Sequence, residues 1–305
     1  MGQPILYGIL FLWIKSLAIW PLRVLYVFSD MLCFLVYRVV KYRLKVVRAN
    51  LLHSFPDWTD EERRRTERKF YHHFADYIME TVKLAHLSHR EALRRACIRN
   101  PEMIKPLLEQ GHTCLILLMG HYGNWEWFTG SRPFFGGEVQ VHPIYRPLTN
   151  RVFDRLFLFL RSRLGAFGIR KSDVVRDVIR LKQASTPSLV LFIADQTPSR
   201  ANLHYWTTFL HQETAMLTGP ERIAVKLNLP VIFVDIQKIR RGYYSVDFEL
   251  ITDRPKEMPR HWITEEYARR MERCILREPA YWLWTHKRWK YHRHEESLCA
   301  GNVSE

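Results

Sequence analysis

Residues 113–126 read TCLILLMGHYGNWE, and this stretch decides the fold. Residues 113–119 form a short apolar run between Gly111 and Gly120, which is typical of an interior strand of a sheet. His121 follows almost at once. The sequence therefore predicts a buried strand that places a histidine at its carboxyl end.

His121 and Glu126 are the candidate catalytic pair. On a continuous helix, residues five apart point about 140° away from each other, so the pair cannot be intrahelical. Gly123 permits a tight loop and Asn124 is a good N-cap, which places Glu126 in the first turn of the next helix. From there its carboxylate could reach back to the imidazole, and the helix dipole would keep it ionised. The alternative is a structural histidine beside a capping glutamate, because short motifs match often by chance.

The length and the net charge of the chain limit the number of domains and the kind of molecule that it binds. The chain has 305 residues and a formal net charge of +15. Its length suits one large domain with a substantial core. The charge points to a polyanionic partner, which could be nucleic acid, an anionic membrane surface, or a phosphorylated or acidic substrate.

The cysteines are scattered and odd in number. No two of them form a C-x-x-C pair, which argues against both a disulfide framework and a zinc ribbon. This usage fits a reducing compartment. The five positions are Cys33, Cys97, Cys114, Cys274 and Cys299.

The first forty residues predict a membrane anchor. Residues 5–22 carry only Lys15 as a charge, and residues 24–40 form a second apolar run. A membrane span needs about 20 predominantly apolar residues, so Lys15 and Arg23 make both candidates imperfect. One span and a membrane-embedded helical hairpin both stay open, beside a hairpin buried in a globular core. Basic residues follow directly, which places the rest of the chain on the cytoplasmic side.

The remaining chain predicts an α/β fold with a mixed, largely buried sheet flanked by helices. A capping box at residues 59–62 opens a long helix. We divide the chain into an anchor at 1–40, a helical membrane-proximal segment at 41–100 and an α/β domain at 101–305. The expected strands are 113–119, 139–144, 188–194, 230–236 and 244–251, and the expected later helices are 151–164, 173–181, 219–227 and 264–277, the last with Thr264 as its N-cap.

Further polar groups follow the predicted strands. In open α/β sheets, sites form outside the carboxyl ends of the strands, and His121, Tyr145 and Asp195 all occupy such places. Other polar segments include Arg161 to Gly165 and a basic, tryptophan-rich stretch at 278–290.

These segments together resemble the late lipid A acyltransferases, the lauroyl and myristoyl transferases of the lysophospholipid acyltransferase superfamily. The resemblance covers nearly the whole chain. It rests on the order and spacing of five motifs: H-x4-E at 121–126, Y-R-x-x-x-N at 145–150, Arg163 before Gly165, Asp195-Gln196, and W-L-W-x-H-K-R-W-K at 282–290.

The resemblance implies an acyltransferase at the bacterial inner membrane, with its catalytic domain on the cytoplasmic face. Its acyl donor would be an acyl thioester of acyl carrier protein, or less often of coenzyme A, and its acceptor a hydroxyl of a glycolipid, a lipid A precursor. A different amphiphile, such as a phosphatidylinositol mannoside, a lysophospholipid or an aminolipid, is the alternative acceptor. A membrane-tethered nucleic-acid binder ranks lower, because no nucleic-acid-binding signature is visible, and we expect no nucleic-acid partner.

The expected chemistry follows from the residue types. An alcohol needs a base to take its proton as it attacks a thioester, and His121 fits that role, with Glu126 orienting the ring. Arg163 is the candidate for stabilising the oxyanion, by resemblance and by charge; its alternative is a salt bridge at a helix end. No acyl-enzyme is required, because the thioester is already activated.

Six further residues are candidates for substrate binding. Arg146 could hold a lipid phosphate, while Asn150 could instead cap the following helix, and Asp195 could instead cap a turn. The basic stretch at 286–294 could grip a phosphate, pack at a membrane interface or bind nucleic acid. We expect no cofactor, and no metal at His292, His294, Glu295 and Glu296, since a terminal segment offers little rigid support for ligands. The substrate candidates are Arg146, Asn150, Asp195, Gln196, His286 and Arg288.

Overall fold

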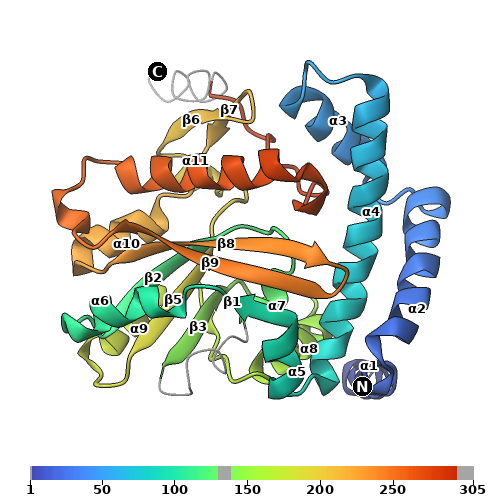
Figure 1. The fold of residues 1–305 in the computed structure, drawn as a ribbon, viewed down its shortest axis with the longest axis horizontal. Coiled ribbons are helices and arrows are strands. Elements are labelled where there is room, and N and C mark those ends of the chain that lie inside the picture. Colours follow the sequence, from blue (N-terminus) through green and yellow to red (C-terminus); the bar gives the residue numbers. More distant parts are fainter. Residues whose placement is uncertain (1, 130–138, 294–305) are drawn as a thin grey trace, which may run out of the picture.

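The computed structural model describes residues 2–129 and 139–293, and its centre is a seven-stranded sheet (Figure 1). The strand order is β1-β9-β8-β2-β5-β3-β4, and neighbouring strands pair in parallel except for the antiparallel pair β8 and β9. The strands are β1 (Ala96–Ile98), β2 (Cys114–Met119), β3 (Gln140–Tyr145), β4 (Ile169–Arg170), β5 (Ser188–Ile193), β8 (Val231–Arg240) and β9 (Tyr243–Thr252).

Strand β2 lies in the middle of the sheet and is buried along its whole length. It pairs with β5 in parallel from Cys114 opposite Ser188 to Met119 opposite Ile193. An apolar run without alternation suits a strand that is covered on both faces. Because the two strands end side by side, the residues that follow them emerge next to each other at one edge of the sheet.

Helices cover both faces of this sheet (Figure 1). Successive residues of β2 alternate between two apolar cores: Ile116 packs into the core that includes residues of α10 and α11, and Leu117 packs into the core on the other face. The helices after the N-terminal region are α5 (His89–Arg95), α6 (Lys105–Glu109), α7 (Trp125–Thr129), α8 (Arg151–Ser162), α9 (Val174–Gln183), α10 (Gly219–Leu227) and α11 (Trp262–Arg277), with short 3₁₀ turns η2 (Leu84–His86), η3 (Pro101–Ile104), η5 (Arg200–Asn202), η6 (Pro255–Glu257) and η7 (Pro279–Tyr281).

The N-terminal helices pack along one side of the α/β core (Figure 1). Helix α4 stands beside α2, while α1 packs against α8, where the rings of Phe11 and Phe159 lie 4.9 Å apart. The predicted capping box opens α4, with the Thr59 side chain and the Glu62 side chain each bonded to the other residue's backbone N–H. The elements are α1 (Gly2–Ile19), α2 (Leu22–Phe34), the π-helical turn η1 (Leu35–Val39), α3 (Leu44–Ser54) and α4 (Asp60–Lys83).

The two apolar runs at the N-terminus form two separate helices, α1 and α2. Within residues 2–129 and 139–293, every helix is too short or too polar to cross a bilayer. The structure therefore supplies a pair of apolar helices, and the membrane anchor at 1–40 stays a prediction.

The five expected strands are all present, with boundaries that differ by up to four residues. Three pieces of β structure were not predicted: β1, β4 and the small antiparallel hairpin of β6 (Trp206–Phe209) and β7 (Gln212–Ala215). The N-cap predicted for α11 is wrong. His261 occupies that position, and Thr264 lies inside the helix, where its backbone N–H donates to Glu221 at 2.9 Å.

Candidate active site

His121 lies at the carboxyl end of β2, as predicted, in the short loop before α7. Its side chain keeps 18 % of its surface exposed, so a substrate group can reach the ring. The indole of Trp125 meets the imidazole edge to face, with the ring centroids 5.1 Å apart. This packing restricts the ring to one orientation.

The carboxylate that contacts the ring belongs to Asp195, two residues beyond the end of β5. Its Oδ1 lies 2.6 Å from Nδ1 of His121, and its Oδ2 accepts hydrogen bonds from the backbone N–H of His121 at 2.8 Å and from Nε1 of Trp282 at 2.7 Å. Asp195 is buried, with 3 % of its surface exposed. Three donors therefore hold both oxygens of one buried carboxylate.

These contacts determine the tautomer of His121. A carboxylate only accepts hydrogen bonds, so Nδ1 must carry the proton that it donates to Asp195. Nε2 of the neutral ring then keeps its lone pair, and the side-chain nitrogen of Gln196 lies 3.3 Å from it. Both neighbours of the ring, Asp195 at Nδ1 and Gln196 at Nε2, are among the residues predicted to bind substrate.

The electrostatics of Asp195 favour its ionised form. Burial raises the pKa of this carboxyl, but charge on His121 and the hydrogen bonds from His121 and Trp282 outweigh burial and hold the pKa at about 2. The group is therefore ionised at neutral pH, as is needed to stabilise an imidazolium formed during reaction.

The carboxylate of Glu126 does not make the predicted contact with His121. It lies in the first turn of α7, as expected, but its carboxylate accepts two hydrogen bonds from the guanidinium of Arg161 on α8, at 2.6 and 2.8 Å. Glu126 is buried. Its side chain points toward α8, where Arg161 binds it, so the predicted contact of Glu126 with His121 is corrected: the carboxylate at the ring is that of Asp195.

An apolar cavity lies beside the Glu126 and Arg161 pair. It has a volume of about 350 Å³ and opens between β3 and α8. Tyr145, Phe159 and Gly168 contribute to its wall, together with Arg161. Arg161 thus lines this mostly apolar cavity and also binds Glu126, which lies in the helix that follows the His121 loop.

Three predicted residues lie on the surface near α8. Arg163 is exposed at the C-cap of α8, and none of the hydrogen bonds or ion pairs between described residues joins it to His121 or Asp195. Arg146 is also exposed. The side chain of Asn150 accepts a hydrogen bond from the backbone N–H of Val152 at 2.9 Å, so Asn150 is the N-cap of α8.

His286 and Arg288 belong to the C-terminal segment, which contacts the loop after Asp195. Nε2 of His286 accepts from the backbone N–H of Thr197 at 3.2 Å, which ties the C-terminal segment to the loop after Asp195. Arg288 has only 2 % of its surface exposed, and its guanidinium donates to the carbonyl of Ala215 at 2.7 Å. Its Nε and Nη1 have no hydrogen-bond partner among the described residues, and substrate binding by Arg288 stays a prediction.

Two contributors were named in the sequence analysis only as members of polar segments, without a role at the site. Trp282, which donates to Asp195, and Arg161, which holds Glu126, come from elements distant in the chain. The signal that the sequence offered for Asp195 was its place directly after a predicted strand, which His121 shares.

Metal binding has weak support among the described residues. Asp30, His72 and Asp76 offer ligand atoms within 4.8 Å of one another, but the guanidinium of Arg241 already lies between the two carboxylates, with Nη2 2.5 Å from Asp30 and 2.6 Å from Asp76. His294, Glu295 and Glu296 lie outside the described residues.

The fold is α/β, and a histidine held by a buried carboxylate lies at the carboxyl ends of two parallel strands. The family follows from comparison: residues 4–291 match the family described as bacterial lipid A biosynthesis acyltransferase, and the chain belongs to that family. A relative is the lipid A biosynthesis lauroyltransferase of Escherichia coli (strain K12). It is 27% identical over 276 residues, which cover 88% of this chain and 86% of the relative.

Proposed function

We propose that this acyltransferase moves a fatty acyl chain from an acyl thioester to a hydroxyl of a lipid A precursor, with His121 as general base and Asp195 as the group that orients it. The contact that carries the proposal is the 2.6 Å separation of His121 Nδ1 and Asp195 Oδ1. Family membership supports acyl transfer to lipid A precursors.

The proposed reaction is a direct transfer. Nε2 of His121 takes the proton of the acceptor hydroxyl while its oxygen attacks the thioester carbonyl. The tetrahedral intermediate then expels the thiolate, which recovers the proton from the imidazolium. Asp195 stabilises the imidazolium in between, as a buried carboxylate does in a serine-hydrolase triad.

An oxyanion forms in this intermediate and needs a hydrogen-bond donor. The amide nitrogen of Gln196 lies 3.3 Å from Nε2 of His121, and this nearness supports Gln196 as the proposed donor. Arg163 remains a second candidate on the strength of the resemblance, although it would have to reach in from the surface of α8.

The cavity between β3 and α8 suits an acyl chain. Its wall is mostly apolar, and burial of each methylene contributes about 0.8 kcal/mol. It lies next to α1 through Phe159, whose ring contacts Phe11. An acyl chain in this cavity would therefore lie between Arg161, which binds Glu126, and the N-terminal helix α1.

The N-terminal helices are proposed to bind the inner membrane from its cytoplasmic face. Exposed apolar side chains along an interfacial helix bind a bilayer without crossing it. Those on α1, α2 and η1 are Ile5, Leu6, Ile9, Leu12, Trp13, Ile19, Val27, Phe28, Met31, Phe34, Leu35 and Val39.

Acyl carrier protein is the proposed donor because it is acidic and the chain carries exposed cations at one end of α4 and on the C-terminal segment. The C-terminal segment contacts α3, the helix that precedes α4, since the side chain of Asn50 donates to the carbonyls of Trp284 and His286. The exposed cations include Arg64, Arg65, Arg68, Lys287 and Lys290. Faster transfer from acyl carrier protein than from coenzyme A, with a rate that falls as salt rises, is expected.

The decisive experiment measures acyl transfer to a lipid A precursor by purified His121→Ala and Asp195→Ala variants. Loss of a general base costs roughly 10²- to 10⁴-fold in rate. His53→Ala is the matched control, because His53 is an exposed histidine at the end of α3. Wild-type activity in His121→Ala would refute the proposal, and mass spectrometry of lipids from a deletion strain would reveal a different acceptor.

A further inference from the structure

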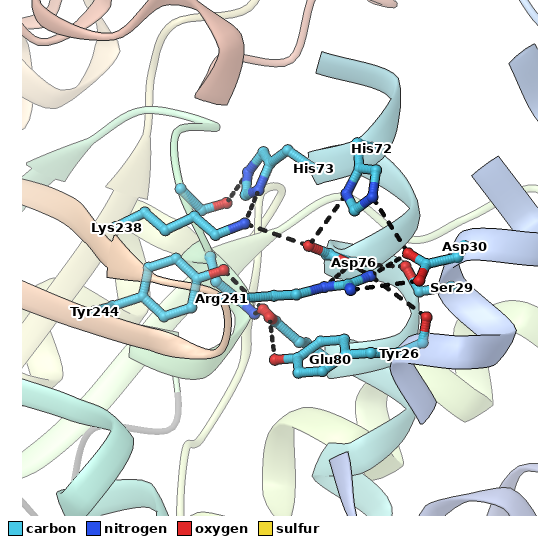
Figure 2. Close-up of polar contacts among 12 residues, drawn as sticks. Tyr26, Ser29, Asp30, His72, His73, Asp76, Glu80, Lys238, Arg241 and Tyr244 are labelled. Carbon is cyan, nitrogen blue, oxygen red and sulfur yellow. Dashed lines mark hydrogen bonds and ion pairs between the residues drawn. The ribbon is translucent and has the colours of Figure 1, made fainter. Parts of the chain in front are cut away.

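One face of α4 carries three buried polar residues at helical spacing, His73, Asp76 and Glu80. Figure 2 shows that they face the β8 and β9 strands on one side and α2 on the other. Burying charges costs free energy and often contributes little net stability. We therefore expect the polar network that these three residues form to have a function.

Glu80 holds the loop that carries His121. It is fully buried, and its Oε2 accepts hydrogen bonds from Nδ2 of Asn124 at 2.6 Å and from the hydroxyl of Tyr244 at 2.7 Å. Asn124 in turn caps α7, because its Oδ1 accepts from the backbone N–H of Trp127. One carboxylate on α4 therefore determines where the His121 loop turns into its helix.

His73 holds the residue just before Asn124. Its Nε2 lies 3.2 Å from the carbonyl oxygen of Gly123, and its Nδ1 lies 3.2 Å from Nζ of Lys238 (Figure 2). A lysine ammonium only donates, so Nδ1 must accept, and Nε2 must carry the proton that it donates to Gly123. Lys238 thus selects the tautomer of His73 that can hold the loop.

The same network reaches α2. The hydroxyl of Tyr26 donates to Oε1 of Glu80 at 2.9 Å, and the hydroxyl of Ser29 donates to Asp76 at 2.7 Å (Figure 2). Arg241, in the turn between β8 and β9, bridges Asp76 and Asp30. Gly123 and Asn124 of the His121 loop are therefore connected through α4 to α2, and the other face of α2 is exposed and apolar.

We propose that His73 and Glu80 are positioning residues for His121, and that Tyr26 couples α2 to the His121 loop through Glu80. The inference rests on the proposed function, because it concerns the placement of the same base. A helix bound to the membrane surface would then help to hold His121 against Asp195 while the lipid acceptor arrives. None of these residues needs to touch substrate.

Two tyrosines of the N-terminal region make a matched test. Tyr26 donates to the buried Glu80, and Tyr37 donates in the same way to the buried Glu67 at 2.8 Å. Glu80 also accepts a hydrogen bond from Asn124 of the His121 loop, whereas Glu67 accepts hydrogen bonds from Arg48, which is not in that loop. Tyr26→Phe and Tyr37→Phe each remove one phenol hydroxyl, and only the first lies on the route to His121.

The expected result is that Tyr26→Phe lowers kcat about tenfold with little change in KM, while Tyr37→Phe keeps the wild-type kcat. Both are measured as pure, folded protein, with melting temperatures compared to remove effects on stability. Equal kcat values for the two variants, with His121→Ala inactive, would overturn the coupling and leave the proposed function standing. An active His121→Ala would overturn the proposed function instead.

His73 provides a second, independent test. The amide of His73→Gln can place a nitrogen near the position of Nε2 and donate to Gly123, whereas His73→Leu fills space without a donor. We expect His73→Leu to lower kcat about 100-fold, the cost of displacing a catalytic group by about 1 Å, and His73→Gln to recover most of it. Identical activity of the two variants at the same folded fraction would contradict a positioning role for His73.

Discussion

Nδ1 of His121 lies 2.6 Å from Oδ1 of Asp195, a residue 74 positions further along the chain. The parallel pairing of β2 with β5 brings the two together, because both strands end at the same edge of the sheet. The backbone N–H of His121 donates to the same carboxylate, so the loop and the ring are held at once.

Asp195→Asn should lower kcat by about 10⁴-fold, as the same change does in a serine protease triad. The oxygen of an asparagine would accept from Trp282 and from the backbone of His121, which leaves its NH₂ group facing Nδ1. The ring would then have to protonate on Nε2 and could not act as a base. Steady-state kinetics on the purified variant measure this loss.

Glu126→Gln provides the comparison that separates the two carboxylates. It breaks the ion pair with Arg161 but leaves the contact between His121 and Asp195 in place. We therefore expect a smaller loss than for Asp195→Asn. A larger loss from Glu126→Gln would return the orienting role to the carboxylate that the sequence first suggested.

The sequence was sufficient to predict the central strand and the place of His121, because a fully buried strand has a clear apolar run. It could not predict which carboxylate faces the ring. The spacing of Glu126 shows only that it begins a helix, whereas the direction of its side chain depends on its ion pair with Arg161 of α8, a partner 35 residues away. Asp195 was identified as a site residue, but its partner depends on strand order, which a single sequence does not reveal.

The hairpin of β6 and β7 was missed for a local reason. Its two-residue loop is Leu210 and His211, both with positive φ, at +50° and +63°. Such loops usually contain asparagine and glycine, which signal a hairpin in the sequence. Leucine and histidine carry no such signal, so nothing in this segment indicated a turn.

Acid should destabilise the protein between about pH 6.5 and pH 4 because burial lowers the pKa of three histidines, His73, His142 and His286. Burial, reinforced by the Lys238 charge, lowers the pKa of His73 to about 3. Burial also lowers the pKa of His286 to about 4. In this window the unfolded chain binds protons that the folded chain does not, so the free energy of unfolding falls as pH falls, by about 1.4 kcal/mol per pH unit for each of His73 and His286.

Urea unfolding at several pH values measures that slope, and His286→Gln should flatten it. The glutamine side chain does not titrate but can still accept from the backbone of Thr197. The carboxyl of Asp195, whose pKa is held at about 2, contributes only at lower pH, since its stabilising effect is lost as pH falls from about 4 through 2. If the free energy of unfolding of His286→Gln keeps the same dependence on pH, His286 is not a neutral group in the folded protein.

Gly168→Leu should shift the preferred acyl chain toward shorter donors. A Cβ atom at Gly168 would lie 3.2 Å from two ring carbons of Tyr145, and both residues line the cavity, so a larger side chain at Gly168 takes up space at the cavity wall. Loss of burial for two methylenes costs about 1.6 kcal/mol, or about tenfold in kcat/KM for the longer chain. A donor series of increasing length measures the profile, and Gly219→Ala, whose added Cβ meets nothing within 4 Å, should leave it unchanged.

Membrane binding should depend on the exposed apolar face of α1 and α2. Trp13 is 57% exposed and Val27 is 60% exposed, so replacing both by serine removes apolar surface without disturbing the core. Burial of one such side chain contributes roughly 1.5–3 kcal/mol, and the double variant should bind anionic vesicles at least 100-fold more weakly in a sedimentation assay. The matched control replaces Val175 and Leu276, which are 43% and 52% exposed on α9 and α11, by serine. If both double variants lose binding equally, the membrane contact is not specific to the N-terminal helices.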